Sequence, residues 1–194
     1  MSQAARELPC TLEDWIELEK SAHVRHEFED GVFRAMSGGN ESHNLITLNL
    51  SDALKPLAKK HGCRRYGIDY KTLANGKGYY PDSMLACAPR GESRYVEPNP
   101  CFIAEVLSPT SIQRYTVEKR QNYLLIPSLE QYVMVYTTEI RVEVYRRRVG
   151  FWQFTELKAL SDALEIVCLG DSITLEQIYE DVILEPETEE PRQD

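Results

Sequence analysis

The chain has 194 residues, a net charge of -9 and 42% hydrophobic residues, which is typical of a soluble globular domain with a sizeable core. No apolar run approaches the ~20 residues of a membrane-spanning helix, and the N-terminus shows no secretory signal. We therefore expect a cytoplasmic protein with one domain over residues 1–180 and an acidic, disordered tail over residues 181–194.

The charge is distributed unevenly. An acidic chain is not in itself typical of nucleic-acid binding, because phosphate contacts need Lys and Arg. Several of the acidic residues belong to the tail, however, and basic residues cluster elsewhere. Such clusters are most often solvated surfaces. The basic clusters of this chain are Arg64-Arg65, Arg114 with Lys119-Arg120, and Arg146-Arg147-Arg148.

The cysteine pattern does not suggest a zinc or disulfide framework. They are odd in number, widely spaced and without a CxxC pair. This pattern predicts reduced thiols in a cytosolic protein and argues against a zinc ribbon or a disulfide scaffold. The five residues are Cys10, Cys63, Cys87, Cys101 and Cys168.

The first third of the chain predicts two helices around a hairpin. Residues 11–20 form the first helix, and residues 24–36 form a hairpin with a two-residue turn at Asp30-Gly31. After a glycine-rich break, apolar residues at helical spacing predict a helix over residues 41–60. Pro56 is expected to kink this helix or to end it early.

The rest of the chain predicts mainly strands. Strands around 67–74 and 82–87 are joined through residues 75–78, a further strand spans 101–107, and a helix follows over 112–126. Helices on a mixed sheet predict an α/β or α+β domain. The remaining elements are strands near 130–137, 140–147, 151–156 and 163–167, and a helix near 174–180.

Two carboxylates occupy apolar segments. Asp82 stands at the head of the apolar run 83–87, and Glu105 lies inside the run 101–107. A carboxylate in a buried strand is costly unless a cation or a hydrogen-bond partner compensates its charge. Two such groups on neighbouring strands can hold a hard metal ion, which predicts metal-dependent chemistry on phosphate esters.

Lys119 lies on one stripe of the 112–126 helix, and its companions on that stripe favour burial. Its ammonium group either turns outward to solvent or reaches a buried carboxylate, of which Glu105 is the nearest in sequence. The other members of the stripe are Ile112, Tyr115, Tyr123 and Ile126.

His43 and Glu27 have weaker signals. His43 lies on the inward face of the 41–60 helix, where a lone histidine is more often structural. Near two carboxylates it would instead orient a ligand or a phosphate. Glu27 lies in the first strand of the hairpin, where the simplest interpretation is a surface charge.

Four segments, taken together in their order along the chain, resemble the Uma-type restriction endonuclease family, a branch of the PD-(D/E)XK nuclease superfamily. The resemblance covers about residues 11–180 and implies a restriction endonuclease-like core, a mixed central sheet flanked by helices. The segments are HEFEDGVFRAMSGGNESHNLITLNL (26–50), YYPDSMLAC (79–87), FIAEVLSPTS (102–111) and EKRQNYLLIPSLEQYVMVY (118–136).

The resemblance also implies a metal site. Asp82 and Glu105 would bind a divalent ion, usually Mg²⁺ with Mn²⁺ as a substitute, helped by the backbone carbonyl of Val106. The superfamily usually places a lysine two residues after the glutamate, and this chain has Leu107 there. The family moves the lysine to the following helix, where Lys119 corresponds to it.

Glu27 and His43 match further family positions in or near this site. Related sequences commonly carry an aspartate where this chain has Tyr115. The resemblance implies a Mg²⁺-dependent endonuclease that cleaves double-stranded DNA, for which a homodimer with two sites is the simplest assembly. Two alternatives stay open: a non-catalytic nucleic-acid or protein interaction module on a nuclease fold, and a hydrolase of small phosphate esters.

Overall fold

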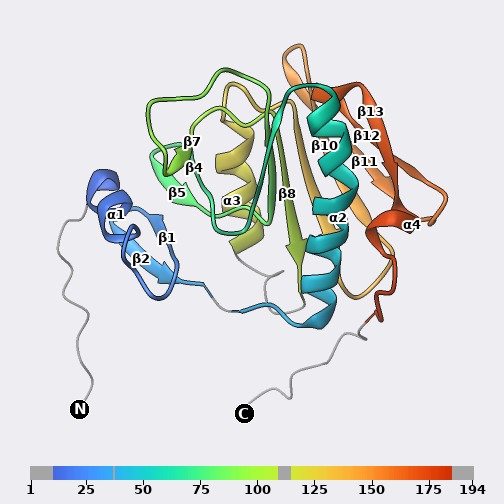
Figure 1. Cartoon of the computed structure of the whole chain (residues 1–194), viewed down its shortest axis with the longest axis horizontal. Helices are drawn as coiled ribbons and strands as arrows, with labels where there is room; N and C mark the ends of the chain where they lie inside the picture. The colour runs from blue at the N-terminus through green and yellow to red at the C-terminus, as the bar shows by residue number, and fades with distance from the viewer. Residues whose placement is uncertain (1–10, 37, 109–114, 185–194) are drawn as a thin grey trace.

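A six-stranded mixed sheet forms the middle layer of the structure (Figure 1). The computed structural model describes residues 11–36, 38–108 and 115–184, except the side chains of residues 115 and 116. The strand order is β11-β10-β9-β8-β6-β3, in which only β8 and β9 pair in parallel. The strands are β3 (Arg64–Gly67), β6 (Ser83–Ala86), β8 (Phe102–Leu107), β9 (Gln131–Tyr136), β10 (Val142–Arg148) and β11 (Phe151–Leu157).

One face of this sheet is covered by α2 (Glu41–Lys60), as Figure 1 shows beside β8. The apolar stripe of α2 packs against alternate residues of β8, among them Ala104 and Val106. Burial of each large apolar side chain contributes about 1.5–3 kcal/mol, and this face holds the largest buried cluster. The same layer contains β12 (Ala163–Ile166), the short 3-10 helix η1 (Val167–Leu169), β13 (Asp171–Thr174) and α4 (Leu175–Ile178).

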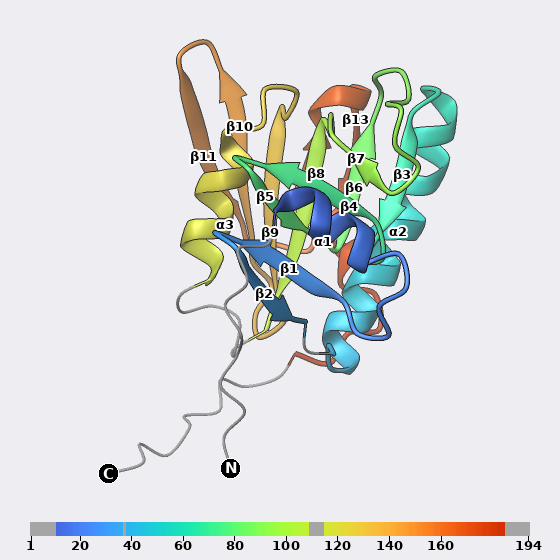
Figure 2. The same cartoon turned by 90° about the vertical axis from the view of Figure 1, so that its left-hand side faces the viewer.

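The opposite face is covered by α3 (Tyr115–Leu124) and by a second, five-stranded sheet of order β2-β1-β5-β4-β7. Figure 2 shows this side, with α1 (Leu12–Leu18) and the β1–β2 hairpin in front of the larger sheet. Trp15 of α1 packs with Phe28 and Tyr80 in a small separate cluster. The strands are β1 (His26–Glu29), β2 (Val32–Ala35), β4 (Lys71–Ala74), β5 (Lys77–Tyr79) and β7 (Val96–Glu97).

Several elements agree with the sequence prediction. The hairpin turn lies at Asp30 and Gly31, whose φ angles of 49° and 83° are the left-handed values that a two-residue turn requires. The helix over 41–60 is confirmed in full, and Pro56 does not end it early. The mixed central sheet with helices on both faces is confirmed as well.

The prediction of one strand pair joined through residues 75–78 was wrong. Asn75 and Gly76 make a tight turn with φ angles of 52° and 74°, so that β4 pairs with β5. β6 belongs instead to the six-stranded sheet, between β3 and β8. The error arose because a turn was interpreted as a longer linker, which concealed the short strand β5.

The chain continues to contact the core beyond residue 180. Val182 and Leu184 pack against the cluster under α2, and the Ser42 hydroxyl donates to the Ile183 carbonyl over 2.8 Å. The tail that was expected to be disordered over residues 181–194 therefore starts with residues that pack on the core, and residues 185–194 lie outside the described residues. Within the described ranges, no helix is both long and apolar enough to span a membrane.

The prediction of separate, reduced cysteines was wrong. Disulfides join Cys63 to Cys87 and Cys101 to Cys168, with Cα–Cα distances of 4.3 and 6.2 Å. The β3–β6 register pairs Arg64 with Ala86, so it sets residues 63 and 87 side by side although 24 positions separate them. Spacing along the chain does not report such long-range pairing. Cys10 lies outside the described residues.

Candidate active site

The pairing of β6 with β8 brings the two carboxylates together. Ser83 pairs with Ala104, so the antiparallel register sets Asp82 opposite Glu105. Side chains alternate along a strand, which directs both carboxylates to the face covered by α3. The Val106 N–H donates to Asp82 Oδ2 over 2.7 Å. Asp82 and Glu105 are only 8% and 7% exposed, so their charges need compensation.

Lys119 supplies a positive charge at this point. Its Nζ lies 2.9 Å from Glu105 Oε1 and 2.6 Å from Glu27 Oε1, and its side chain is 13% exposed. Burial lowers the pKa of Lys119, but Glu105 and Glu27 outweigh burial and raise it above its usual value. The ammonium group therefore stays charged. Of the two orientations considered for this lysine, the structure has the inward one.

Tyr123 is the site residue that the sequence reasoning missed. Its hydroxyl donates to Glu105 Oε1 over 2.8 Å, and the side chain is fully buried. The sequence placed Tyr123 on the buried stripe of α3 but gave it no role. Its spacing from Lys119 was the available signal, since residues four apart on a helix project to the same face. Ile112 and the side chain of Tyr115, also on that stripe, lie outside the described residues.

His43 approaches the site from the start of α2. Its backbone N–H is capped by Asn40 Oδ1 over 2.9 Å, and its Nε2 lies 3.3 Å from Asp82 Oδ1. The hydrogen bond to Asp82 raises the pKa of His43 against the opposing effect of burial, and Glu105 adds to the increase. A Cβ at Gly39 would stand 2.6 Å from the ring, so the glycine-rich break makes room for this imidazole.

The five predicted side chains thus meet in one place, with more negative than positive charge. Burial raises the pKa of Glu105 to about 7; Lys119 opposes this increase, and Asp82 and Glu27 add to it. Glu27 Oε1 is buried and accepts no hydrogen bond among the described residues, although it forms the ion pair with Lys119.

This donor set fits a hard divalent cation. Carboxylate oxygens are the ligands that Mg²⁺ prefers, and one or two of them suffice because this ion keeps several waters. Such an ion would also offset the burial and the neighbouring negative charges that raise the pKa of Glu105. Leu107, at the usual lysine position, packs in the apolar cluster with Met84 and Ile103. The metal role of the Val106 carbonyl stays a prediction.

The pKa of Glu105 predicts a stability that depends on pH. Without divalent ions, the free energy of unfolding should fall by about 3 kcal/mol as pH rises from the unfolded pKa of 4.5 to the folded value of about 7. The sign follows because the folded chain binds the Glu105 proton more tightly than the unfolded chain does. His43, with its raised pKa, continues the decline above pH 6.5.

Urea unfolding in EDTA at several pH values measures this decline. Glu105→Gln should flatten it, and Mg²⁺ should restore more stability at pH 8 than at pH 5, because the cation favours the ionised carboxylate. A Glu105→Gln profile as steep as the native one would contradict the assignment of the raised pKa to this residue.

A second group of side chains surrounds the Lys119 ammonium group and the helix that carries it. The Tyr79 hydroxyl donates to Glu29 Oε1 over 2.6 Å and accepts from Asn122 Nδ2 over 2.8 Å. The Tyr79 and Tyr123 rings lie 5.5 and 5.8 Å from the Lys119 ammonium nitrogen. Since these contacts link β1, β5 and α3, they fix the helix that carries Lys119 relative to β1, the strand that carries Glu27.

Comparisons with known proteins identify the family of the chain. Residues 12–176 match the Uma2 family, described as "Putative restriction endonuclease". Two uncharacterized proteins of Synechocystis sp. are similar to this chain. The first is 30% identical, and the match covers 86% of this chain and 90% of that protein. The second is 33% identical, and the match covers 80% of this chain and 91% of that protein.

A solved structure shares the fold. It is described as "a putative nuclease belonging to DUF820" from Anabaena variabilis, and it superposes with a TM-score of 0.73 at 14% identity. The likeness covers 90% of this chain and all of that chain. The family match extends over most of the sequence and includes every segment that contributes to the site. The chain belongs to the Uma2 family of restriction endonuclease-like proteins.

Proposed function

We propose that the chain is a Mg²⁺-dependent endonuclease that hydrolyses phosphodiester bonds of double-stranded DNA. One observation carries the proposal: the Lys119 ammonium contacts Glu105 at 2.9 Å, on the strand paired with the one that Asp82 precedes. Two acidic metal ligands and a lysine can together activate water and stabilise the charge that develops in phosphodiester hydrolysis. The family membership supports a nuclease in general, and the DNA substrate and the metal are our inference.

Each residue has a distinct part in the proposed reaction. A divalent cation held by Asp82, Glu105 and the Val106 carbonyl would activate water and neutralise charge on the phosphate. Lys119 orients the attacking water and stabilises the negative charge that develops on the phosphate oxygens. Glu27 holds the lysine in place through their ion pair.

His43 braces Asp82, because its ring contacts the Oδ1 atom of that carboxylate. In its charged form the ring also suits a phosphate contact. Water attacks phosphorus opposite the leaving oxygen and releases one proton to solvent as the new P–O bond forms. The bond to the leaving oxygen breaks, and that oxygen takes up a proton from solvent. Two strands are cut most simply by two sites, so we propose a homodimer on the DNA.

The test compares substrates. The purified chain is incubated with closed circular DNA, linear duplex, single strands, RNA and nucleotide esters, each with Mg²⁺, Mn²⁺ or EDTA. We expect nicked and linear products from the circular DNA with either metal and none in EDTA. Cleavage of nucleotide esters alone would indicate a small-molecule hydrolase. Absence of both cleavage and calorimetric metal binding would indicate an interaction module.

Tyr123 is expected to position Glu105 in this reaction. Tyr123→Phe removes a hydrogen bond to a charged group, worth about 1.5–3 kcal/mol, so cleavage should slow by about 10-fold or more. The acid limb of the pH–rate profile should also move to higher pH, because ionised Glu105 loses a donor.

Tyr132→Phe is the matched control for this variant. The Tyr132 hydroxyl is buried and makes no hydrogen bond among the described residues, so its removal should leave rate and profile unchanged. A slower Tyr123→Phe enzyme with an unshifted acid limb would assign Tyr123 a packing role only.

A further inference from the structure

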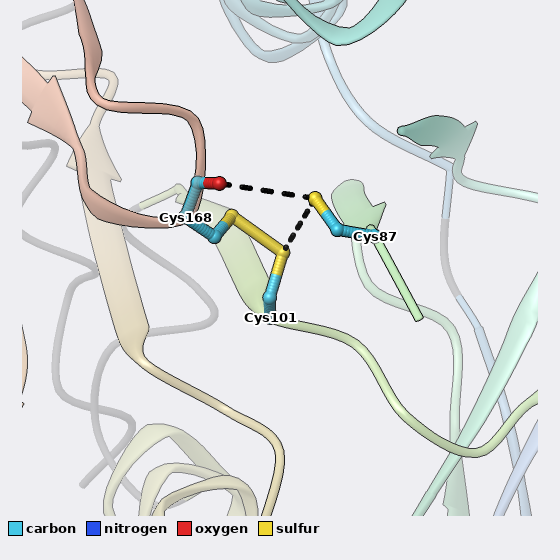
Figure 3. Close-up of side chains that lie close together, drawn as sticks. All are labelled: Cys87, Cys101 and Cys168. Atoms are coloured by element: carbon cyan, nitrogen blue, oxygen red, sulfur yellow. Dashed lines mark hydrogen bonds between the residues drawn. A yellow bond between two sulfur atoms is a disulfide. The ribbon is translucent and has the colours of Figure 1, made fainter. Parts of the chain in front are cut away.

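Four cysteines from separate segments meet at the other end of the β6–β8 pair. Cys63 precedes β3, Cys87 follows β6, Cys101 precedes β8 and Cys168 lies in η1. Figure 3 shows three of them, Cys87, Cys101 and Cys168, gathered around one point. The sulfur atoms of these three lie within 4.8 Å of one another, and Cys63 is bonded to Cys87.

We propose that these four residues form a second metal site, in which the thiolates of the reduced chain bind one Zn²⁺ ion. Zinc takes four thiolates in a tetrahedron with Zn–S distances of about 2.3 Å, so neighbouring sulfurs stand about 3.8 Å apart. The Cys87 and Cys101 sulfurs, which belong to different disulfides, are 3.6 Å apart. Three of the four sulfurs are thus already gathered, and the Cys63 sulfur, bonded to Cys87, would have to rotate toward them once the bonded pairs separate.

The backbone around the cysteines is fixed, as a metal site requires. The Cys101 N–H donates to the Leu85 carbonyl over 2.8 Å, and the Cys63 N–H donates to the Ala58 carbonyl over 2.9 Å. Cys101 is only 6% exposed, whereas Cys87 is exposed. Cys63 and Cys168 are partly buried, so the site is closed at Cys101 and open to a metal ion or a reductant at Cys87.

This site is separate from the carboxylates in place and in chemistry. Asp82 precedes β6 and Cys87 follows it, a separation of roughly 16 Å along an extended strand. Thiolates are soft ligands that select zinc, whereas carboxylates select Mg²⁺. A bound zinc ion would tie β3, β6, β8 and η1 together and so secure the two strands from which Asp82 and Glu105 project.

The test begins with the reduced full chain. A phosphine reductant supplies two electrons per disulfide, two protons are taken up, and two thiols form. After removal of the reductant without oxygen, a thiol count in denaturant should give all five cysteines. Titration of the folded chain with Co²⁺ should then yield one equivalent with the intense visible absorption of a tetrahedral thiolate complex. Zn²⁺ should abolish that absorption and protect four thiols from alkylation.

Matched variants identify the ligands. Cys87→Ser and Cys168→Ser, both at least partly exposed, should lose the absorption while far-ultraviolet circular dichroism stays native. Cys10→Ser, outside the described residues, and Asp82→Asn should keep it. The proposal is overturned if the reduced folded chain shows no such absorption, if the cysteine variants retain it, or if the disulfides resist reduction until the chain unfolds.

Discussion

Asp82→Asn and Glu105→Gln should each lower the rate of Mg²⁺-dependent DNA cleavage by at least about 10³-fold, or about 4 kcal/mol of transition-state stabilisation. Both replacements keep the shape of the side chain and remove its charge. The amide oxygen introduced at Asp82 can still accept from the Val106 N–H, so the local backbone is preserved. The expected loss therefore comes from metal binding and not from unfolding.

The measurement is the rate of nicking of closed circular DNA at saturating Mg²⁺. Glu97→Gln is the matched control. Glu97 lies in β7, the edge strand of the smaller sheet, and is a buried carboxylate, 3% exposed, that pairs with Arg64 of β3. This variant should cleave at the native rate. If the two site variants nick DNA as fast as the control does, the carboxylates do not form the metal site.

The sequence predicted the central part of the site because local rules apply there. The apolar run around Glu105 predicts a buried strand, and helical spacing on α3 turns Lys119 toward the same layer. The structure then adds the contact between them at 2.9 Å. A surface or structural role was the simplest interpretation of Glu27 and His43, and only His43 had a ligand-orienting alternative of its own. The family resemblance was needed to connect both with the site.

The rest depended on long-range pairing, which spacing does not encode. The second sheet exists because β4 pairs with β5 and β7 and not with β6, a choice that apolar patterns alone do not determine. The cysteines meet for the same reason: Cys101 and Cys168 lie 67 residues apart and come together only when η1 folds over the end of β8. A pattern of CxxC pairs would have been a local signal, and this chain lacks one.

Lys119→Met should destabilise the fold by about 3–5 kcal/mol at pH 8 in EDTA, because Glu105 and Glu27 stay buried without their cation and must either hold an uncompensated charge or take up a proton. The native lysine has a raised pKa, so its stabilising charge is fully present at pH 8. Urea unfolding measures the effect. The cost should shrink at pH 5, where Glu105, with its pKa of about 7, is protonated in the folded chain.

Two further variants separate charge from packing in this result. Adding Glu27→Gln to Lys119→Met removes one of the two carboxylates that lack a cation and should recover part of the lost stability. Lys77→Met is the control, because Lys77 pairs over 3.0 Å with the exposed Asp30 and should cost no more than about 1 kcal/mol. A Lys119→Met chain as stable as the Lys77 variant at pH 8 would mean that the carboxylates need no cation. The charge argument for a metal between Asp82 and Glu105 would then fail.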